Sequence, residues 1–142
     1  MSVVQAICTS FKVELLQGVH DFTPVTGDVF KLALYTEAAN LSALTTVYSA
    51  TDEITASGAY TTGGVTLTQT ALGSDGTTAL VSFTNLSIAA TITASAAMIY
   101  NSSAANRAVA VLDFGGPRTS AGGAFVITFP SANAASAIIR IG

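Results

Sequence analysis

The residues whose side chains could best take part in acid–base catalysis are His20 and Asp21, which are adjacent in the chain. A histidine and a carboxylate could serve as a general base and its orienting partner if their side chains met within hydrogen-bond distance. Neighbouring side chains on an extended segment point apart, however, and no Ser or Cys nucleophile motif surrounds this pair. We therefore interpret His20 as a loop histidine that bonds the backbone, and we predict no catalytic residue.

Metal and phosphate chemistry also lack a suitable motif. Asp52 and Glu53 form an acidic pair, but a calcium loop needs further carboxylates at alternating positions, which the neighbouring residues do not supply. The lone Cys8 excludes an internal disulfide and a cysteine-based metal cluster. The glycine-rich residues 115–123 contain Arg118 but no Lys-Ser/Thr after their glycines, so they are not a phosphate loop. We predict no metal and no cofactor, and we interpret residues 115–123 as a flexible hairpin or an assembly loop.

The composition points to protein contacts rather than chemistry. Charged residues make up 9% of the 142-residue chain, against about 25% in ordinary soluble domains, whereas hydrophobic residues make up 50%. A folded domain of this composition should expose wide neutral faces of small side chains, and such faces favour packing against other proteins. We expect a structural or interaction protein rather than an enzyme.

The few charges also limit the classes of partner. The net charge is −3, and the basic residues are scattered along the chain: Lys12, Lys31, Arg107, Arg118 and Arg140. This spacing offers no basic stripe to neutralise a phosphate backbone, so we expect no nucleic-acid binding. No stretch approaches the roughly 18 apolar residues of a membrane span, so we expect no membrane association. The N-terminus lacks the pattern of a secretory signal, so we expect an intracellular soluble product, or one that reaches its destination by assembly rather than export.

The first residues differ in pattern from the rest of the chain. Apolar residues recur there at helical spacing, namely Val4, Ile7, Cys8, Phe11 and Leu15. This spacing predicts one amphipathic helix over residues 3–17, which Gly18 would stop. Ser2, three residues before Gln5, would begin the helix with a capping box. The apolar helix face must dock either on the protein's own sheet or on a neighbouring subunit.

After Pro24 and Gly27 the pattern becomes strand-like. Short runs of apolar and β-branched residues are separated by Gly, Asn, Ser and Pro turns, which is typical of strands. Strands are predicted over residues 28–36, 47–54, 65–71, 78–83, 91–100, 107–114, 125–129 and 137–141. We expect Gly115, Gly116 and Pro117 to break the chain after residue 114. About eight strands predict an all-β, jelly-roll-like antiparallel sandwich with one N-terminal helix, although a Greek-key sandwich fits the pattern equally well.

The whole chain, residues 1–142, is predicted to be a single domain. We see no internal repeat and no linker, so the N-terminal helix would occupy residues 1–18 and the β-sandwich residues 28–142. Outward-facing Thr and Ala would leave flat, uncharged sheet surfaces. Long strands with neutral edges are normally an aggregation hazard, so partners should cover them in the working state.

Arginine is the residue type best able to anchor a partner on so neutral a surface. Its planar guanidinium pairs with carboxylates and backbone carbonyls, and the chain has Arg107, Arg118 and Arg140. For any one of them, an exposed solubilising role is an equally good interpretation. The predicted interface joins these arginines to the apolar helix face, namely Val4, Ile7, Phe11 and Leu15.

Three pieces of the sequence are similar to a known group of proteins. They are FKLALYT at residues 30–36, IYNSS at 99–103 running on through RAVAVLDFG at 107–115, and ITFP at 127–130 with IIRI at 138–141. In order and spacing, these pieces resemble a family of small virion structural proteins of tailed bacteriophages, over most of the chain from about residue 18 onward. Some similar proteins are capsid cement, or decoration, proteins with a jelly-roll fold that clamp neighbouring major capsid proteins together.

The resemblance implies a non-enzymatic capsid cement protein that binds across major capsid protein subunits and stabilises the assembled head. It implies a place on the capsid surface of the virion after synthesis in the host cytoplasm. We also expect a homo-oligomer, most simply a two-fold dimer. The alternative is a tail or fibre β-sandwich module for host-surface attachment, whose glycan contacts would come from Tyr35, Tyr48, Tyr60 and Tyr100. An enzyme is the least favoured class, because neither a nucleophile–base pair nor a metal set can be assembled.

Overall fold

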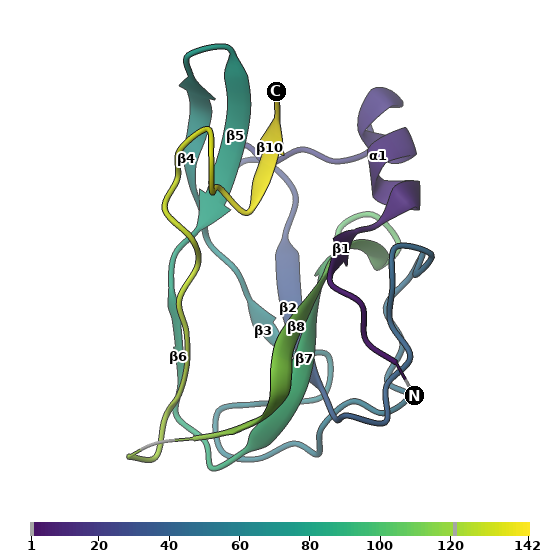
Figure 1. The fold of residues 1–142 in the computed structure, drawn as a ribbon, viewed down its shortest axis with the longest axis vertical. Coiled ribbons are helices and arrows are strands. Elements are labelled where there is room, and N and C mark those ends of the chain that lie inside the picture. Colours follow the sequence, from purple (N-terminus) through teal and green to yellow (C-terminus); the bar gives the residue numbers. More distant parts are fainter. Residues whose placement is uncertain (1, 121) are drawn as a thin grey trace.

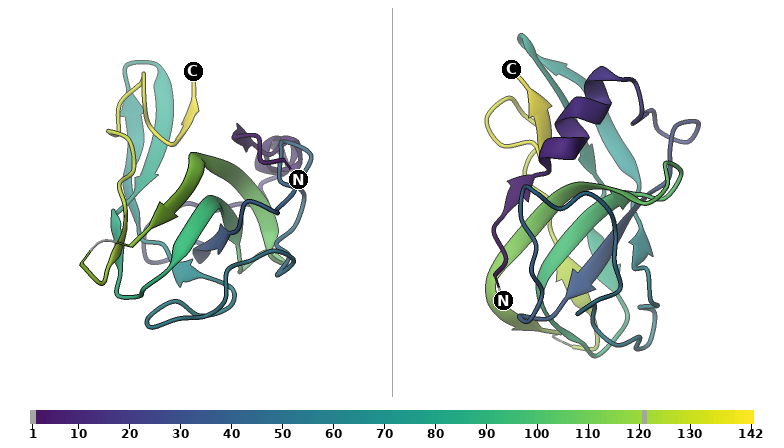
Figure 2. Two further views of the ribbon diagram at one scale, coloured as in Figure 1. Left: turned by 60° about the horizontal axis from the view of Figure 1, so that its bottom comes forward. Right: turned by 90° about the vertical axis from the view of Figure 1, so that its right-hand side faces the viewer.

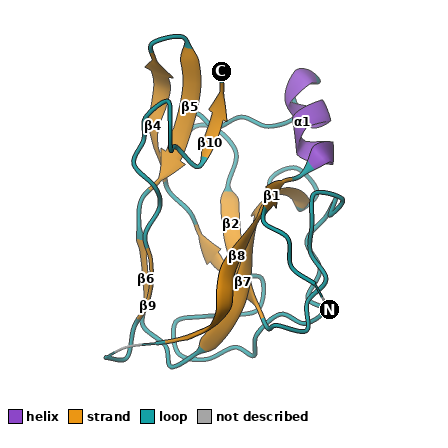
Figure 3. Cartoon of the chain, viewed as in Figure 1, coloured by secondary structure: helices purple, strands orange, loops and turns teal. Residues whose placement is uncertain are grey.

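The fold consists mainly of antiparallel β-strands (Figure 1, Figure 3). The computed structural model describes residues 2–120 and 122–142. Within these residues, ten strands form sheets of five, three and two strands, and a single helix lies near the N-terminus. The predicted all-β sandwich with one N-terminal helix is therefore confirmed, with ten strands in place of about eight.

The five-stranded sheet is the centre of the molecule, and its strands follow the order β1-β8-β7-β2-β3. Their bounds are β1 (Ala6–Ile7), β2 (Phe30–Tyr35), β3 (Val65–Thr66), β7 (Thr93–Asn101) and β8 (Arg107–Thr119). The central strands β2 and β7 are buried on both faces, which explains why their sequences are almost continuously apolar. Their register places Leu32 opposite Ile99 and Ala33 opposite Met98.

The two smaller sheets have the orders β10-β5-β4 and β6-β9. Their bounds are β4 (Gln69–Asp75), β5 (Thr78–Phe83), β6 (Leu86–Ile88), β9 (Phe125–Ile127) and β10 (Ile139–Ile141). A turn at Asp75-Gly76 joins β4 to β5, with Gly76 at φ +60°. In Figures 1 and 2 the smaller sheets stand on one side of the five-stranded sheet, and α1 lies near its opposite edge.

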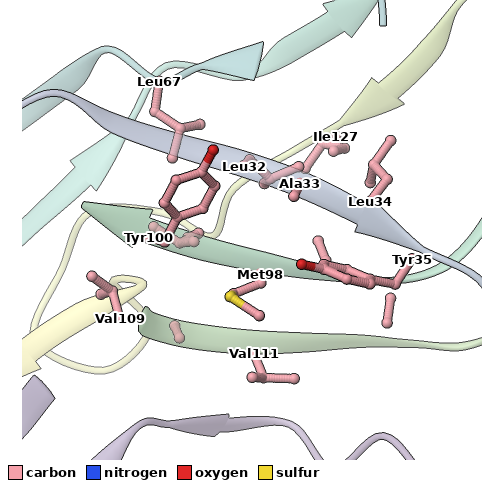
Figure 4. Packing of buried hydrophobic residues seen from close by; sticks show 14 of the residues in the cluster. Leu32, Ala33, Leu34, Tyr35, Leu67, Met98, Tyr100, Val109, Val111 and Ile127 are labelled. Carbon is pink, nitrogen blue, oxygen red and sulfur yellow. The ribbon is translucent and has the colours of Figure 1, made fainter. Parts of the chain in front are cut away.

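Side chains fill both faces of the five-stranded sheet. On the face toward the smaller sheets, Phe30 lies 6.3 Å from Phe83 between ring centroids, and Phe83 lies 5.6 Å from Phe129. Residues 36–64 form a long loop that covers the other face, where Met98 and Tyr100 are buried (Figure 4). Residues 47–54, predicted as a strand, belong to this loop and form isolated bridges to the sheet instead.

The N-terminal helix is shorter than the sequence pattern predicts. Helix α1 spans Thr9–Leu16, whereas the residues before Cys8 are extended, and β1 pairs with β8. β-Branched Val3 and Ile7 suit a strand as well as a helical stripe, and the edge of β8 offers them partners. The predicted capping box does not form, because Gln5 accepts a hydrogen bond from the Asp113 N–H. Gly18, at φ +73°, follows the helix end as predicted.

Strand β8 continues through the glycines that were predicted to break it. Residues 114–117 of β8 stand opposite the single residue Ser95 of β7, which makes a bulge larger than the usual two residues against one. Gly115 and Gly116 take φ values of +77° and +133°, a region that other residues rarely adopt. The Arg118 side chain closes the bulge by donating from Nε and Nη2 to the Phe114 carbonyl. The bulge lets one strand span two pairing registers.

Candidate interaction surface

The inward side of α1 belongs to the protein's own core. Phe11 is 1% exposed, and its ring centroid lies 4.9 Å from that of His20 and 5.9 Å from that of Phe22. Leu15 is partly buried against the same cluster. Phe11 and Leu15 were predicted to contact a partner, and this prediction needs correction. Helical spacing of apolar residues marks the side of a helix that docks, and here that side docks on its own sandwich.

The outward side of α1 is apolar as well. Val13 is 52% exposed and Leu16 is 91% exposed. Leu44, which is 82% exposed, neighbours Ala43, whose carbonyl accepts a 2.8 Å hydrogen bond from the N–H of Thr9 at the helix start. We call Val13, Leu16 and Leu44 the outer helix residues. They offer contact area that the folded chain leaves in water.

Two other predicted interface residues come together elsewhere. Ile7 and Arg140 line one hollow of about 340 Å³ between β1 and the segment that leads into β10. Val4, 56% exposed, lies in the extended segment before β1. Ile7 therefore lies on an edge strand and Val4 in the segment before it, rather than on a helix face.

The three arginines have different surroundings. Arg107 donates from Nη1 to Glu14 Oε2 at 3.0 Å. Arg118 donates to the Phe114 carbonyl within the bulge of β8. Arg140 is exposed on β10, and within residues 2–120 and 122–142 its side chain has no hydrogen-bond or ion-pair partner. Arg140 is therefore the arginine with the most freedom to bind a carboxylate outside the chain.

His20 is buried, and both of its ring nitrogens form hydrogen bonds to side chains. Its Nε2 lies 2.9 Å from Glu14 Oε1, and its Nδ1 lies 3.0 Å from the Asn101 amide nitrogen, which also donates to Asp28. Because an amide NH₂ can only donate, Nδ1 accepts and Nε2 carries the proton. The side chain is 0% exposed, so both ring nitrogens serve to tie α1 to β7. The predicted loop histidine thus bonds side chains rather than the backbone.

The four tyrosines gather around Glu53. Tyr48 and Tyr60 donate to its two carboxylate oxygens at 2.5 and 2.6 Å, and the Gly63 N–H donates at 2.9 Å. Tyr100 donates to the Gly63 carbonyl, and Tyr35 donates to another backbone carbonyl of the loop. Burial raises the pKa of all four tyrosines, and the Glu53 carboxylate raises it further. The cluster fastens the 36–64 loop to the sheet, and the sequence pattern gave no sign of it.

Few other side chains among the described residues could react or bind a ligand. Cys8 is buried, and burial with the nearby Glu14 raises the pKa of its thiol to about 11, which disfavours the reactive thiolate. No group of three or more His, Cys, Asp or Glu side chains comes together among the described residues. A hollow of about 440 Å³ lies between β8 and β9, with Phe114, Phe125 and Arg118 in its lining. No helix in the described part of the chain is long and apolar enough to cross a membrane.

Comparison with known proteins gives no match. No family model, no curated protein and no solved structure matches this chain.

Proposed function

We propose that this chain is a non-enzymatic capsid cement protein of a tailed bacteriophage, which binds across major capsid protein subunits and stabilises the assembled head. The observation that carries the proposal is the exposed apolar side of α1, where Leu16 is 91% exposed. Phe11, on the opposite side of the same helix, packs α1 against the core. Val13 and Leu16 therefore stay exposed to solvent, where a partner protein can contact them. Burying one such side chain in a partner contributes roughly 1.5–3 kcal/mol.

The mechanism is stabilisation by mass action. The binding sites span neighbouring capsid subunits, so they exist in the assembled shell and not on free subunits. Binding there shifts the equilibrium between free subunits and shell toward the shell. The low charge of the chain suits a large neutral contact, since charged groups are costly to desolvate at the centre of an interface. Arg140 adds a polar anchor at another place on the surface.

The alternative function, a tail or fibre module for glycan attachment, has less support from the geometry. A glycan site built on tyrosines needs aromatic rings that are exposed to solvent. Tyr35, Tyr60 and Tyr100 are at most 3% exposed, and their hydroxyls bond within the chain. These three rings are therefore not accessible for stacking on a glycan. The fourth, Tyr48, is partly buried, with its ring stacked on Tyr100 and its hydroxyl donating to Glu53.

The decisive experiment is quantitative mass spectrometry of purified virions of the phage that encodes the chain. We expect a copy number near that of the major capsid protein. Replacing Leu16 by Asp should abolish incorporation while leaving the circular dichroism spectrum unchanged, because Leu16 contributes little to the core. Val25→Asp is the matched control, since Val25 is fully exposed on a different loop and should still permit incorporation.

Other outcomes would redirect the proposal. A handful of copies per particle would place the chain at the tail or a vertex and favour the attachment module. Absence from the particle would remove the virion role altogether. If the Leu16→Asp variant enters particles as well as Val25→Asp does, the outer helix residues are not the contact. Arg140→Ala, measured by the thermal midpoint of the shell, then tests the hollow beside β1 as the alternative contact.

A further inference from the structure

The extended segment before α1 forms an open edge of the five-stranded sheet. Strand β1 is the last strand in the order β1-β8-β7-β2-β3, so it has a sheet neighbour on one side. Figure 2 shows this segment on the surface of the molecule. Ala6 and Ile7 pair with β8, and Val3 forms a parallel bridge with Leu41 of the 36–64 loop. A strand edge carries a row of N–H and C=O groups that another strand can pair with.

The hydrogen bonds of this segment show which groups are unpaired. Val4 N–H donates to the Leu41 carbonyl, the Leu41 N–H donates to the Ser2 carbonyl, and Cys8 N–H donates to the Val109 carbonyl. The even-numbered residues therefore direct their backbone groups toward the protein. Because backbone groups alternate along a strand, the N–H and C=O groups of Val3, Gln5 and Ile7 point away from the sheet. In the described part of the chain, these groups have no backbone partner, since β8 is the only strand that pairs with β1 there.

This edge lacks the usual protection against pairing. Natural edge strands are commonly blocked by lysine, proline or an inward-pointing charge. The residues from Ser2 to Cys8 are uncharged and contain no proline, and β-branched residues stand at positions 3, 4 and 7. The edge is therefore suited to a partner strand that is itself uncharged and β-prone.

We propose that the partner is the same segment of a second copy, paired antiparallel about a two-fold axis at Gln5. In this register Gln5 faces Gln5 of the other copy, and Val3 faces its Ile7. All three residues direct their backbone groups outward, so each pair exchanges both N–H···O bonds. The segment is self-complementary, because no charge meets a like charge across the axis. The dimer joins two five-stranded sheets and closes the open edge in both copies.

The test uses the complete chain in solution. Gln5→Pro removes an outward N–H and places a ring at the axis without breaking an internal backbone bond, since proline is tolerated on a strand edge. Gln5→Ala is the matched control, because both variants lose the side-chain bond to Asp113. Sedimentation equilibrium should show a wild-type dimer of the 14.3 kDa chain. Gln5→Pro should raise its dissociation constant about tenfold or more, and Gln5→Ala should change it little.

Hydrogen exchange of the wild-type protein gives an independent measurement. The amides of Gln5 and Ile7 should gain protection as the protein concentration rises, whereas those of Val4 and Cys8 should be protected at every concentration. A monomer up to about 100 µM would overturn the proposal. A dimer whose Gln5 and Ile7 amides stay unprotected would overturn it as well. The inference does not rest on the virion role, since a dimer that pairs here but never enters a particle would remove the role alone.

Discussion

Two glutamates attach segments of the chain to the five-stranded sheet: Glu14 attaches α1, and Glu53 attaches the 36–64 loop. Their carboxylates have different kinds of hydrogen-bond partner. Glu14 on α1 meets the Arg107 guanidinium at 3.0 Å and the His20 ring at 2.9 Å. Glu53 in the 36–64 loop accepts from two tyrosine hydroxyls and one backbone N–H. The first carboxylate has a cationic partner, whereas the donors around the second are neutral. The net charge of the two clusters therefore differs.

This difference predicts that the two attachments fail under different conditions. Above its pKa a tyrosine loses the proton that it donates to Glu53, and two negative charges then face each other. The Glu14 cluster holds no tyrosine, so this loss of a donated proton does not act on the contact between Glu14 and Arg107. A rise in pH should therefore release the 36–64 loop while α1 stays attached.

The largest expected effect is the loss of stability in alkali. In the unfolded chain tyrosines titrate near pH 10, whereas burial and Glu53 keep Tyr35 and Tyr60 protonated above that pH in the folded protein. Between these values the folded state binds more protons, so the free energy of unfolding falls as pH rises. The stabilisation is fully present below about pH 10. Above it, each of these tyrosines should remove about 1.4 kcal/mol per pH unit.

Urea unfolding between pH 8 and about 11.5, followed by circular dichroism, checks this expectation. Tyr60→Phe should lower the stability at pH 8 because one hydrogen bond is lost, but its decline above pH 10 should be shallower. A decline equally steep in Tyr60→Phe and in the wild type would show that Tyr60 is not among the groups that titrate.

The sequence pattern predicts strands β2, β5 and β7 well, because runs of apolar and β-branched residues between turn residues mark buried strands directly. Strand β5 has the predicted bounds 78–83, and β2 and β7 lie within two residues of theirs. The errors arise where two structures suit the same residues. Val3, Val4 and Ile7 fit a helical stripe and an edge strand equally, and pairing with β8 decides between them. Gly115 and Gly116 suit a chain break and a bulge equally, and Arg118 stabilises the bulge.

The candidate surface is harder to predict from sequence for a physical reason. Helix α1 is apolar on both sides, so spacing alone does not tell which side faces water, and Phe11 rather than Leu16 is buried. Glu14 is a charged residue among the apolar residues of α1, yet it is buried against Arg107, 93 residues later in the chain. Contacts over such separations leave no local pattern. The tyrosine cluster was missed for the same reason.

A smaller effect is expected from removing the two glutamates one at a time. Glu53→Ala leaves two hydroxyls and an amide without their acceptor in a buried cluster, which should cost about 2–4 kcal/mol. Glu14→Ala leaves His20 and Arg107 without theirs. Since the Arg107 side chain is 43% exposed, water can solvate it, and the cost should be nearer 1–2 kcal/mol.

Chemical denaturation at pH 7 measures both variants, with Glu37→Ala as the control. Glu37 is exposed, and its carboxylate has no hydrogen-bond partner among the described residues, so its loss should change the stability by less than about 0.5 kcal/mol. If Glu14→Ala is more destabilising than Glu53→Ala, the ion pair fastens its segment more strongly than the neutral donors do. The comparison between the two clusters would then be reversed.

The smallest expected effect belongs to Arg107→Ala. The Arg107 guanidinium is partly exposed, so its 3.0 Å contact with Glu14 should contribute about 0.5–1 kcal/mol. Glu14 keeps the His20 hydrogen bond in this variant, which limits the loss. The contribution of an ion pair is screened by salt, so the difference from wild type should shrink between about 0.05 and 1 M NaCl. A difference that stays constant with salt would mean that Arg107 acts through the packing of its aliphatic stem, and Glu14 would then resemble Glu53 in depending on uncharged contacts.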